Sequence, residues 1–415
     1  MSCPGGPVRN HDRRSPTVLV TPARSVGATL FVVVGEVSGD IQAARLVDEL
    51  LRRDPSVSVA GMGGSHMAAS GVRLLEDSTT WGVIGHVDPL LRLPTYLRAL
   101  ARVESAIRER RPDVLLLVDF AAFNLRLAER LHGTVPVAYY FPPMVSVRKG
   151  SRARKVARLG MRLLATLRRE ATAFEAAGGD VVFVGHPVVD LTQRALDPAA
   201  ARRRLGIPEE APVVGLLPGS RHQEINAHLP IMLDAAGRIL QRIPEVRFVL
   251  PVPAQELRRA VEARVKMSPV PVRIATNSED AMRSAVLLIT ATGTATLEAT
   301  VLGVPMVAVY RLPWLSWMIA KSVVTIGHAS LPNILAGREI VPELLQHQMT
   351  PVAIADVAVD LLRHPARRDA MRDELLRVAG DLGEPGAAGR AAGEVLRLLD
   401  HVASEKMRGV RWERA

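Results

Sequence analysis

The chain has a single cysteine, Cys3, few aromatic residues and no long apolar run. One cysteine excludes an internal disulfide framework and a zinc site built from several cysteines, and it fits a reducing compartment. Aromatic residues make up 4% of the 415 residues, so Val, Leu, Ala and Ile must fill the core, as they do around buried parallel strands. No run approaches the roughly 18 apolar residues of a membrane-spanning helix, so none is expected.

Residues 1–28 carry no continuous apolar segment, because four prolines interrupt them. That pattern argues against a secretory signal, and we expect a disordered extension ahead of a cytoplasmic protein. Lys and Arg outnumber Asp and Glu by 53 to 42, a formal net charge of +11. Nucleic acid, an anionic membrane and phosphorylated small molecules all suit such a charge, and an arginine-rich base bias would produce it without any partner.

Strand-like runs alternate with helical stretches in two successive series. The first has strands at Thr29–Val34, Val57–Ala60, Val114–Val118, Val135–Tyr140 and Val181–Val184, with helices at Ser38–Arg52, Leu97–Arg110 and Asn124–Leu131. The second has strands at Val213–Leu217, Arg247–Pro251, Val272–Ala275, Ala285–Thr290 and Pro305–Val309, with helices at Asp197–Leu205, Gln223–Arg242, Pro253–Lys266, Thr294–Leu302, Trp314–Ser322, Pro351–Leu362 and Ala366–Leu399. This alternation predicts βαβ units and parallel sheets.

The length exceeds what one hydrophobic core usually serves, so two domains are expected. We predict an α/β protein with two doubly wound, Rossmann-like domains that face a cleft. The first occupies residues 29–190 and the second residues 191–375, and a C-terminal helix with a basic tail follows at 376–415. Ligands bind outside the carboxyl ends of the strands in such sheets.

In the second series, Leu216–Arg221 ends an apolar strand and opens a helix. Gly219 permits a close backbone approach, Ser220 can cap the helix, and Arg221 can form a charge-assisted pair with phosphate oxygens. An ordinary strand-to-helix turn with a surface arginine would look the same.

A second such turn is Thr292–Glu298, where Gly293 and Thr294 allow a helix N-terminus to face a diphosphate. Glu298, one turn into that helix, can accept hydrogen bonds from ribose hydroxyls or simply remain solvated. Two such turns in one domain indicate a nucleotide-diphosphate site there.

The first series carries two acidic turns. Gly35–Asp40 lacks the glycine spacing of a dinucleotide fingerprint, so a nicotinamide enzyme is disfavoured. Its Glu36, Ser38 and Asp40 are candidates to hold a sugar or an acceptor hydroxyl, although Asp40 also suits a helix N-terminus. Asp119 ends the strand Val114–Val118 and can take a proton from an attacking hydroxyl, or it can serve as a turn or cap residue. The histidines show no metal-binding spacing, and His186 suits a backbone-capping role as well as a ligand role.

Together these segments resemble the lipid-A-disaccharide synthase family of two-domain nucleotide-sugar glycosyltransferases, from about Leu30 to Leu399. The resemblance rests on Gly35–Asp40, Gly61–Gly64, Val118-Asp119, Phe123-Asn124, Phe183–Pro187, Leu216–Arg221, Glu224-Ile225 and Gly293–Glu298. The most specific block is Ser330–Leu345.

The resemblance implies a GT-B hexosyltransferase that joins UDP-2,3-diacylglucosamine to 2,3-diacylglucosamine 1-phosphate through a β-1,6 link and releases UDP. It implies no metal or other cofactor, no nucleic acid, and work at the inner face of the cytoplasmic membrane; it leaves a homodimer open. The roles carried over are Asp119 as general base with Glu36 in the same cleft, Arg221, Thr294 and Glu298 on UDP, and Asn124, Asn333 and Arg338 completing the site.

Three departures from the family pattern fall in the first domain. Ala121-Ala122 stands where relatives have Pro-Asp, Phe141–Val147 replaces a Trp-Ala-Trp segment, and Gln42-Ala43 replaces His-Gly. A diverged transferase with another lipid acceptor, a UDP-N-acetylglucosamine 2-epimerase-like isomerase and a non-catalytic UDP-sugar-binding protein therefore stay as alternatives.

The expected membrane contact rests on two basic stretches, Arg148–Arg158 and Arg162–Arg169. Apolar residues beside the first stretch, namely Met144, Val145 and Val147, are expected to enter the interface while the cations meet anionic headgroups. A solvated basic helix would have the same composition.

Overall fold

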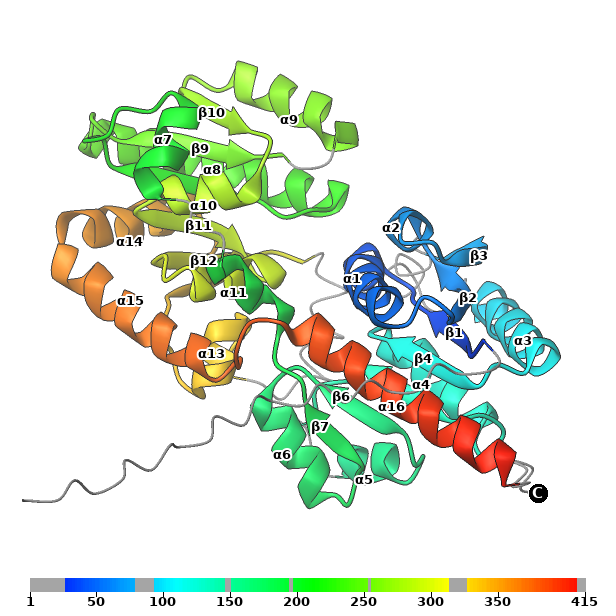
Figure 1. The fold of residues 1–415 in the computed structure, drawn as a ribbon. Coiled ribbons are helices and arrows are strands. Elements are labelled where there is room, and N and C mark those ends of the chain that lie inside the picture. The colour runs from blue at the N-terminus through cyan, green and yellow to red at the C-terminus, as the bar shows by residue number, and fades with distance from the viewer. Residues whose placement is uncertain are drawn as a thin grey trace, which may run out of the picture.

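The protein is described by a computed structural model that covers residues 27–78, 93–145, 151–193, 197–252, 255–312 and 327–408 (Figure 1). The expected helix at Trp314–Ser322 and nearly all of the N-terminal extension lie outside these ranges. Two parallel sheets, each covered by helices, account for the described residues. The predicted fold of two doubly wound α/β domains is confirmed.

The first sheet has seven parallel strands in the order β3-β2-β1-β4-β5-β6-β7. Its strands are β1 (Thr29–Val33), β2 (Ser58–Gly63), β3 (Arg73–Asp77), β4 (Val114–Val118), β5 (Val137–Tyr140), β6 (Arg162–Ala165) and β7 (Val181–Phe183). Its helices are α1 (Val37–Arg53), α2 (Ser65–Ala69), α3 (Leu93–Arg110), α4 (Ala121–Arg130), α5 (Ser151–Ala157) and α6 (Arg168–Ala176). Side chains alternate between two faces, so that Tyr139 joins the core beneath α3 and α4 while Tyr140 joins the core beneath α1.

The second sheet has six parallel strands in the order β10-β9-β8-β11-β12-β13. They are β8 (Val213–Leu217), β9 (Arg247–Pro251), β10 (Val272–Ala275), β11 (Leu287–Ala291), β12 (Met306–Tyr310) and β13 (Glu343–Leu345). The helices are α7 (Pro198–Leu205), α8 (His222–Arg242), α9 (Gln255–Met267), α10 (Ser278–Ser284), α11 (Thr294–Val301), α13 (Leu331–Ala336), α14 (Pro351–Arg363) and α15 (Pro365–Gly380), with 3-10 turns η2 (Pro187–Gln193) and η3 (Gln346–Gln348).

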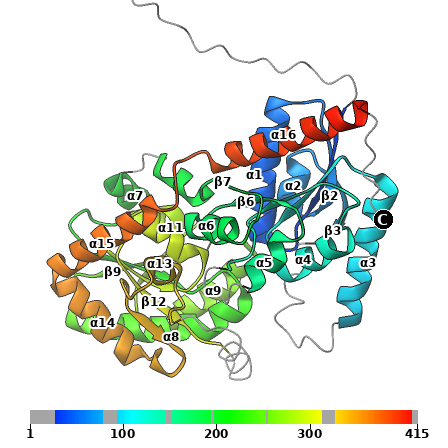
Figure 2. The same ribbon diagram turned by 90° about the horizontal axis from the view of Figure 1, so that it is seen from below.

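The prediction of one long helix at Ala366–Leu399 is wrong. The chain forms α15 and then α16 (Ala387–Met407), separated by a segment in which Gly383 and Gly386 adopt φ of 88° and 89° around Pro385. Left-handed glycines and a proline cannot continue a right-handed helix. After this break α16 returns to the first sheet and packs along α1 (Figures 1 and 2).

The strand order places the four turns picked out in the sequence at two equivalent points. In the first sheet the order reverses between neighbouring strands β1 and β4, and in the second between β8 and β11. The turns after β1 and β4 are Gly35–Asp40 and Asp119–Phe120, and those after β8 and β11 are Pro218–Arg221 and Thr292–Thr294. Such reversal points are where open α/β sheets bind their ligands.

Candidate active site

The turn after β4 has an unusual backbone. Asp119 and Phe120 adopt φ of 49° and 48°, a left-handed conformation that residues with a side chain rarely take. The carbonyl oxygen of Asp119 accepts hydrogen bonds from Asn124 Nδ2 and from the Tyr139 hydroxyl, each 2.8 Å long. Asn124, which we expected to contact substrate, is fully buried and uses its amide to hold this backbone.

The turn after β1 fits against the same two residues. A Cβ atom on Gly35 would lie 2.2 Å from the Phe120 ring, so no other residue fits there without displacing that ring. Phe120 in turn stacks on Phe123, with ring centroids 5.2 Å apart. Glu36 follows Gly35 as the residue that precedes α1, and it is thereby held near Asp119.

The carboxyl group of Asp119 has altered acidity. Burial, together with the negative charge of Glu36, raises the pKa of Asp119 to about 6, against an ordinary value of 3.8. A carboxylate with a pKa near the working pH is a suitable proton acceptor for a hydroxyl nucleophile. Asp119, at the carboxyl end of β4 and with this raised pKa, is therefore a candidate general base.

Asp40, the other acid of the first turn, has a different environment from the one expected. It is buried, and its carboxylate accepts hydrogen bonds from the backbone N–H groups of Gly64, His66 and Met67 at 2.7, 3.0 and 3.3 Å. These bonds hold the start of α2. Ser38, by contrast, is exposed in the first turn of α1 and stays free to meet a ligand.

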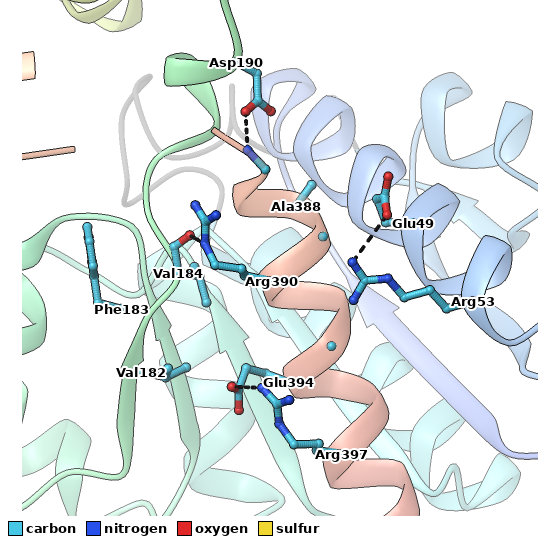
Figure 3. Close-up of a pocket in the computed structure, with 13 residues that line it drawn as sticks. Glu49, Arg53, Val182, Phe183, Val184, Asp190, Ala388, Arg390, Glu394 and Arg397 are labelled. Atoms are coloured by element: carbon cyan, nitrogen blue, oxygen red, sulfur yellow. Dashed lines mark hydrogen bonds and ion pairs between the residues drawn. The ribbon is translucent and has the colours of Figure 1, made fainter. Parts of the chain in front are cut away.

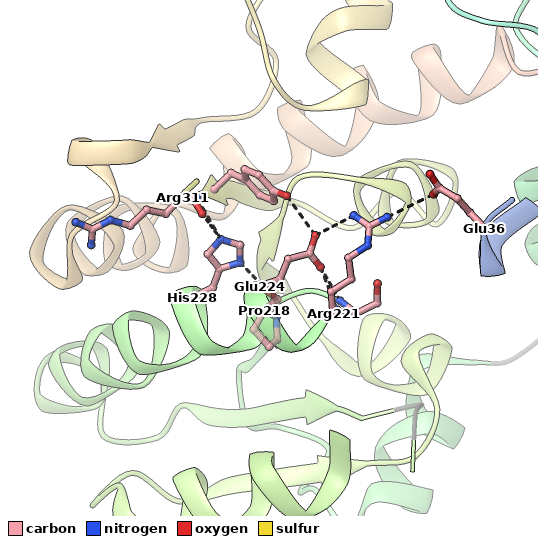
Figure 4. A network of polar contacts seen from close by, with 8 residues as sticks. Glu36, Pro218, Arg221, Glu224, His228 and Arg311 are labelled. Atoms are coloured by element: carbon pink, nitrogen blue, oxygen red, sulfur yellow. Dashed lines mark hydrogen bonds and ion pairs between the residues drawn. The ribbon is translucent and has the colours of Figure 1, made fainter. Parts of the chain in front are cut away.

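The turn after β8 carries a polar network that reaches the first sheet (Figure 4). Arg221 Nη2 lies 3.4 Å from Glu36 Oε2, and Arg221 Nη1 lies 3.6 Å from Glu224 Oε1. Gly219 adopts a φ of 117°, which lets Glu224 close back onto the loop. The contact between Arg221 and Glu36 brings the acidic turn of one sheet and the basic turn of the other into a single site.

Glu224 was not assigned a role from the sequence. Its Oε2 accepts hydrogen bonds from the N–H groups of Ser220 and Arg221 at 2.9 and 3.2 Å, and the Tyr310 hydroxyl donates to its Oε1 at 3.2 Å. An acid three residues after a helix N-cap is a familiar capping pattern, which is the signal that could have identified it. The carboxylate therefore holds the backbone donors expected to face a phosphate.

His228 fixes the same turn from within α8. Its Nδ1 lies 2.7 Å from the carbonyl oxygen of Pro218, and its Nε2 accepts a hydrogen bond from the N–H of Arg311 at 3.1 Å (Figure 4). His186, in the segment that leaves the first sheet, likewise bonds backbone, because its Nδ1 accepts from the N–H of Val188 at 3.1 Å. Burial lowers the pKa of His186 to about 4, which keeps it neutral.

In the turn after β11, Gly293 adopts a φ of 144°, and Gly293 and Thr294 are exposed at the start of α11. Glu298 lies further along the same helix. Burial raises the pKa of Glu298, and the positive charge of Arg45, which α1 contributes from the first sheet, opposes that effect. Glu298 of α11 thus lies within range of the charge of α1.

Asn333 and Arg338, the two residues of the block Ser330–Leu345 expected to contact substrate, both bond other residues of the protein. Asn333 is fully buried; its Nδ2 donates to Glu343 at 2.7 Å, and its Oδ1 accepts from the N–H of Ile340 at 2.7 Å. Arg338 is exposed and pairs with Glu374 of α15 at 2.5 Å. Asn333 therefore shapes this segment, while Arg338 lies on its surface.

A cavity of about 870 Å³ lies away from these turns, between α1, β7 and α16 (Figure 3). Its arginines already have partners: Arg53 lies 3.6 Å from Glu49, Arg397 pairs with Glu394, and Arg390 donates to the carbonyl oxygen of Val184 at 2.8 Å. Of the motif segments only Phe183–Pro187 reaches it, through Phe183 and Val184, and none of the candidate catalytic or substrate-binding residues lines it. Among the described residues there is also no cluster of His, Cys, Asp or Glu that could hold a metal ion.

The family model and the similar proteins of known name point to the same family. Residues 30–382 match the family described as lipid-A-disaccharide synthetase. A Myxococcus xanthus protein named lipid-A-disaccharide synthase is 40% identical over 372 residues, which are 89% of this chain and 97% of the relative. A Syntrophus aciditrophicus protein of the same name is 34% identical over 373 residues, again 89% and 97%.

Solved structures with the same fold are more distant in sequence. The calicheamicin glycosyltransferase CalG4 has a TM-score of 0.59 at 18% identity and covers 92% of this chain and 100% of its own. A Neisseria meningitidis UDP-GlcNAc 2-epimerase bound to UDP-GlcNAc has a TM-score of 0.54 at 13% identity, with coverage of 90% and 100%. The structure of S. aureus MnaA with UDP has a TM-score of 0.59 at 13% identity, with coverage of 91% and 97%.

Proposed function

The chain belongs to the lipid-A-disaccharide synthase family and is a glycosyltransferase, and we propose that Asp119 is the general base of its transfer reaction. The donor is UDP-2,3-diacylglucosamine and the acceptor is 2,3-diacylglucosamine 1-phosphate, joined by a β-1,6 link with release of UDP. The assignment rests on one observation. Glu36 of the first sheet contacts Arg221 of the second and lies near Asp119, so the strand-order reversals of the two sheets form one site.

The reaction needs one proton acceptor and one stabilised leaving group. Asp119 removes the proton from the 6-hydroxyl of the acceptor as the oxygen attacks the anomeric carbon, and the bond from that carbon to UDP breaks with inversion. Arg221 and the N-termini of α8 and α11 offset the negative charge that develops on the departing diphosphate. Glu298 lies deeper in α11, where it can accept a hydrogen bond from the ribose.

A bound diphosphate would have to compete with Glu224 for the N–H groups of Ser220 and Arg221, because those donors already hold its carboxylate. It would also draw Arg221 away from Glu36, since a doubly charged diphosphate attracts a guanidinium more strongly than one carboxylate does. Structures of fold relatives that contain UDP or UDP-GlcNAc support a UDP-sugar donor for this arrangement.

Several expected contact residues take supporting roles in this proposal. Asp40, Asn124 and Asn333 hold backbone rather than substrate, because each is buried and bonded to main-chain groups. Ala122 stands at the start of α4, so the second acid that relatives carry there is absent from this chain. Asp119 is therefore left as the carboxylate of that turn, and Glu36 is the nearest alternative base.

We also propose that the protein binds an anionic membrane surface through α5 and the exposed Met144. No helix of the described residues is long and apolar enough to span a bilayer. The expectation for Val145 is wrong, since it is buried and its N–H donates to Glu170 at 2.6 Å; Val147, Arg148 and Lys149 lie outside the described residues. In the second basic stretch Arg162 pairs with Glu394, Arg168 lies over the Phe183 ring and Arg169 donates to the carbonyl oxygen of Ile334.

This membrane proposal is tested by sedimentation with anionic vesicles at low and high salt. Binding that high salt weakens supports it, because headgroup attraction is screened. Failure to bind at low salt would reject it. A homodimer remains a proposal from the family resemblance alone, and the mass of the protein in solution decides it.

The transferase proposal itself is tested by measuring UDP release with and without the lipid acceptor. We expect release that depends on 2,3-diacylglucosamine 1-phosphate. Epimerisation of the donor sugar without release would indicate an isomerase instead, and neither reaction would indicate a binding protein. Release with a different acylated acceptor only would retain the transferase and correct the acceptor.

A further inference from the structure

The strained turn at Asp119 needs something to maintain it. Two successive residues with side chains in the left-handed region persist only where their surroundings hold them, and such sites gather at functional positions. Both residues here, Asp119 and Phe120, follow directly on a fully buried strand. The groups that hold this turn therefore determine where the carboxylate of Asp119 points.

Three hydrogen bonds hold the peptide groups of Asp119. Its N–H donates to the carbonyl oxygen of Tyr140 at 3.0 Å, which continues the pairing of β4 with β5. Its carbonyl oxygen accepts from Asn124 Nδ2 and from the Tyr139 hydroxyl, both at 2.8 Å. Asn124 belongs to α4, which the turn itself begins, so Tyr139 is the donor that ties the turn to a neighbouring strand.

Tyr139 is rigidly placed. Its side chain is fully buried, and its backbone is paired beside Leu117 in the register of β4 with β5. The ring packs in the core beneath α3 and α4, and its hydroxyl reaches out of that core to the Asp119 carbonyl. A phenol fixed at the ring by packing gives a donor with little freedom to follow a moving acceptor.

We propose that Tyr139 is a positioning residue for the general base: its hydroxyl fixes the Asp119 carbonyl group and thereby the orientation of the Asp119 carboxylate. This inference rests on the proposed role of Asp119. Since Asn124 also bonds that carbonyl, loss of the hydroxyl leaves the oxygen satisfied and the turn folded. What is lost is the second constraint on the peptide plane.

Tyr140 provides a matched control, one residue along the same strand. It is also fully buried, but its ring lies on the opposite face of the sheet, against Phe141 at 4.5 Å between centroids. Its hydroxyl has no hydrogen-bond partner among the described residues. Removing each hydroxyl in turn therefore compares an equal chemical change with and without a bond to Asp119.

The experiment compares Tyr139→Phe, Tyr140→Phe and Asp119→Asn in acceptor-dependent UDP release, with circular dichroism and thermal unfolding as a check of folding. We expect Tyr139→Phe to lower kcat by about 10–100-fold, the scale of a small misplacement of a catalytic group, while the donor KM stays within about threefold. Tyr140→Phe should keep the wild-type kcat.

The pH dependence separates a positioning role from a merely structural one. The charged and titratable groups that face this turn are Glu36 before α1, Tyr139 of β5 and Arg152 of α5. The positive charge of Arg152 lowers the pKa of Tyr139, against the larger effect of burial. If the carboxylate of Asp119 gains solvent in Tyr139→Phe, its pKa falls from about 6, and the acid limb of kcat moves to lower pH. A loss of stability alone would not move that limb.

An unchanged kcat and acid limb in Tyr139→Phe, with Asp119→Asn inactive, would overturn this inference and leave the general base in place. An active Asp119→Asn would instead overturn the base assignment on which it rests. If Tyr139→Phe does not fold, Phe120→Gly loosens the same turn without changing β5, because glycine takes many other backbone conformations. The proposal predicts a lower kcat there too, and an unchanged kcat would contradict it.

Discussion

The turns at the two strand-order reversals are built in different ways. After β4, two residues with side chains, Asp119 and Phe120, take left-handed conformations, and the acid is desolvated. After β8 and β11 the unusual angles fall on Gly219 and Gly293, for which they carry no steric penalty. The turn after β4 thus has a strained backbone and a carboxylate whose charged form is disfavoured by burial. The turns of the second sheet have N–H donors on an unstrained backbone. We infer that chemistry belongs to the former turn and anion binding to the latter.

The largest effect should come from removing the base. Asp119→Asn keeps the size and the left-handed tolerance of the side chain but removes its negative charge. We expect turnover to fall by about 10²–10⁴-fold while the UDP dissociation constant is unchanged, because UDP lies on the other sheet. Steady-state UDP release and calorimetry measure the two quantities.

Asp113→Asn is the matched control, because Asp113 precedes β4 at the opposite end of the same strand. Its carboxylate accepts from the N–H and the hydroxyl of Thr29 at 2.7 and 2.8 Å. This variant should lose stability and keep its turnover. Turnover that survives Asp119→Asn within about threefold, well below the usual general-base effect, would place the base elsewhere, with Glu36 the next candidate.

The same Asp119→Asn variant should be more stable than the wild type above pH 6. The pKa of Asp119 is about 6 when folded and 3.8 ordinarily, so the folded protein holds this proton more tightly than the unfolded chain. Stability is therefore lost as the pH rises from about 4 to about 6, by up to about 3 kcal/mol. Urea unfolding at pH 8 and at pH 4 measures this, and the variant's advantage should shrink at pH 4. If the difference in stability between the variant and the wild type is the same at both pH values, Asp119 is not desolvated.

In the turn after β8, Arg221→Ala should raise the UDP dissociation constant by about tenfold, since a lost charge-assisted pair costs about 1.5–3 kcal/mol. Arg242→Ala is the control, because Arg242 ends the same helix α8 and pairs with Asp356 at 2.5 Å, far along the chain from the turn. An unchanged UDP affinity in Arg221→Ala would remove this site.

The smallest effect should come from Glu36, which links the two sides. Glu36→Gln removes a negative charge that helps to raise the pKa of Asp119, so the acid limb of turnover should move to lower pH. It also frees Arg221 from its contact with the first sheet. An acid limb that stays in place would show that burial alone sets the acidity of Asp119.

The sequence predicted most of the framework. The bounds of β4, β8, β9 and β10 match the expected strands, because runs of Val, Leu and Ile mark buried parallel strands clearly. The short strands β3, β6 and β13 were missed, since none of the three contains a β-branched residue. The break between α15 and α16 was missed although Gly-Glu-Pro-Gly signals it.

The site was predictable in its residues but not in its contacts. Asp119, Glu36 and Arg221 could be chosen because they follow strands, whereas the bond from Tyr139 depends on the order and register of β4 and β5. Burial also divided the candidates, since Asp40 and Asn333 are polar residues in marked motifs whose partners are backbone groups. Residue type alone does not separate a ligand contact from a satisfied internal bond.

The central claim, that a desolvated Asp119 accepts the proton, is tested most directly by the pH dependence of kcat in the wild-type protein. We predict that turnover falls as the pH drops through about 6, where Asp119 becomes protonated, and that the residual turnover of Asp119→Asn lacks this limb. A limb near the ordinary aspartate value of about 4, or a limb that persists in Asp119→Asn, would contradict the claim.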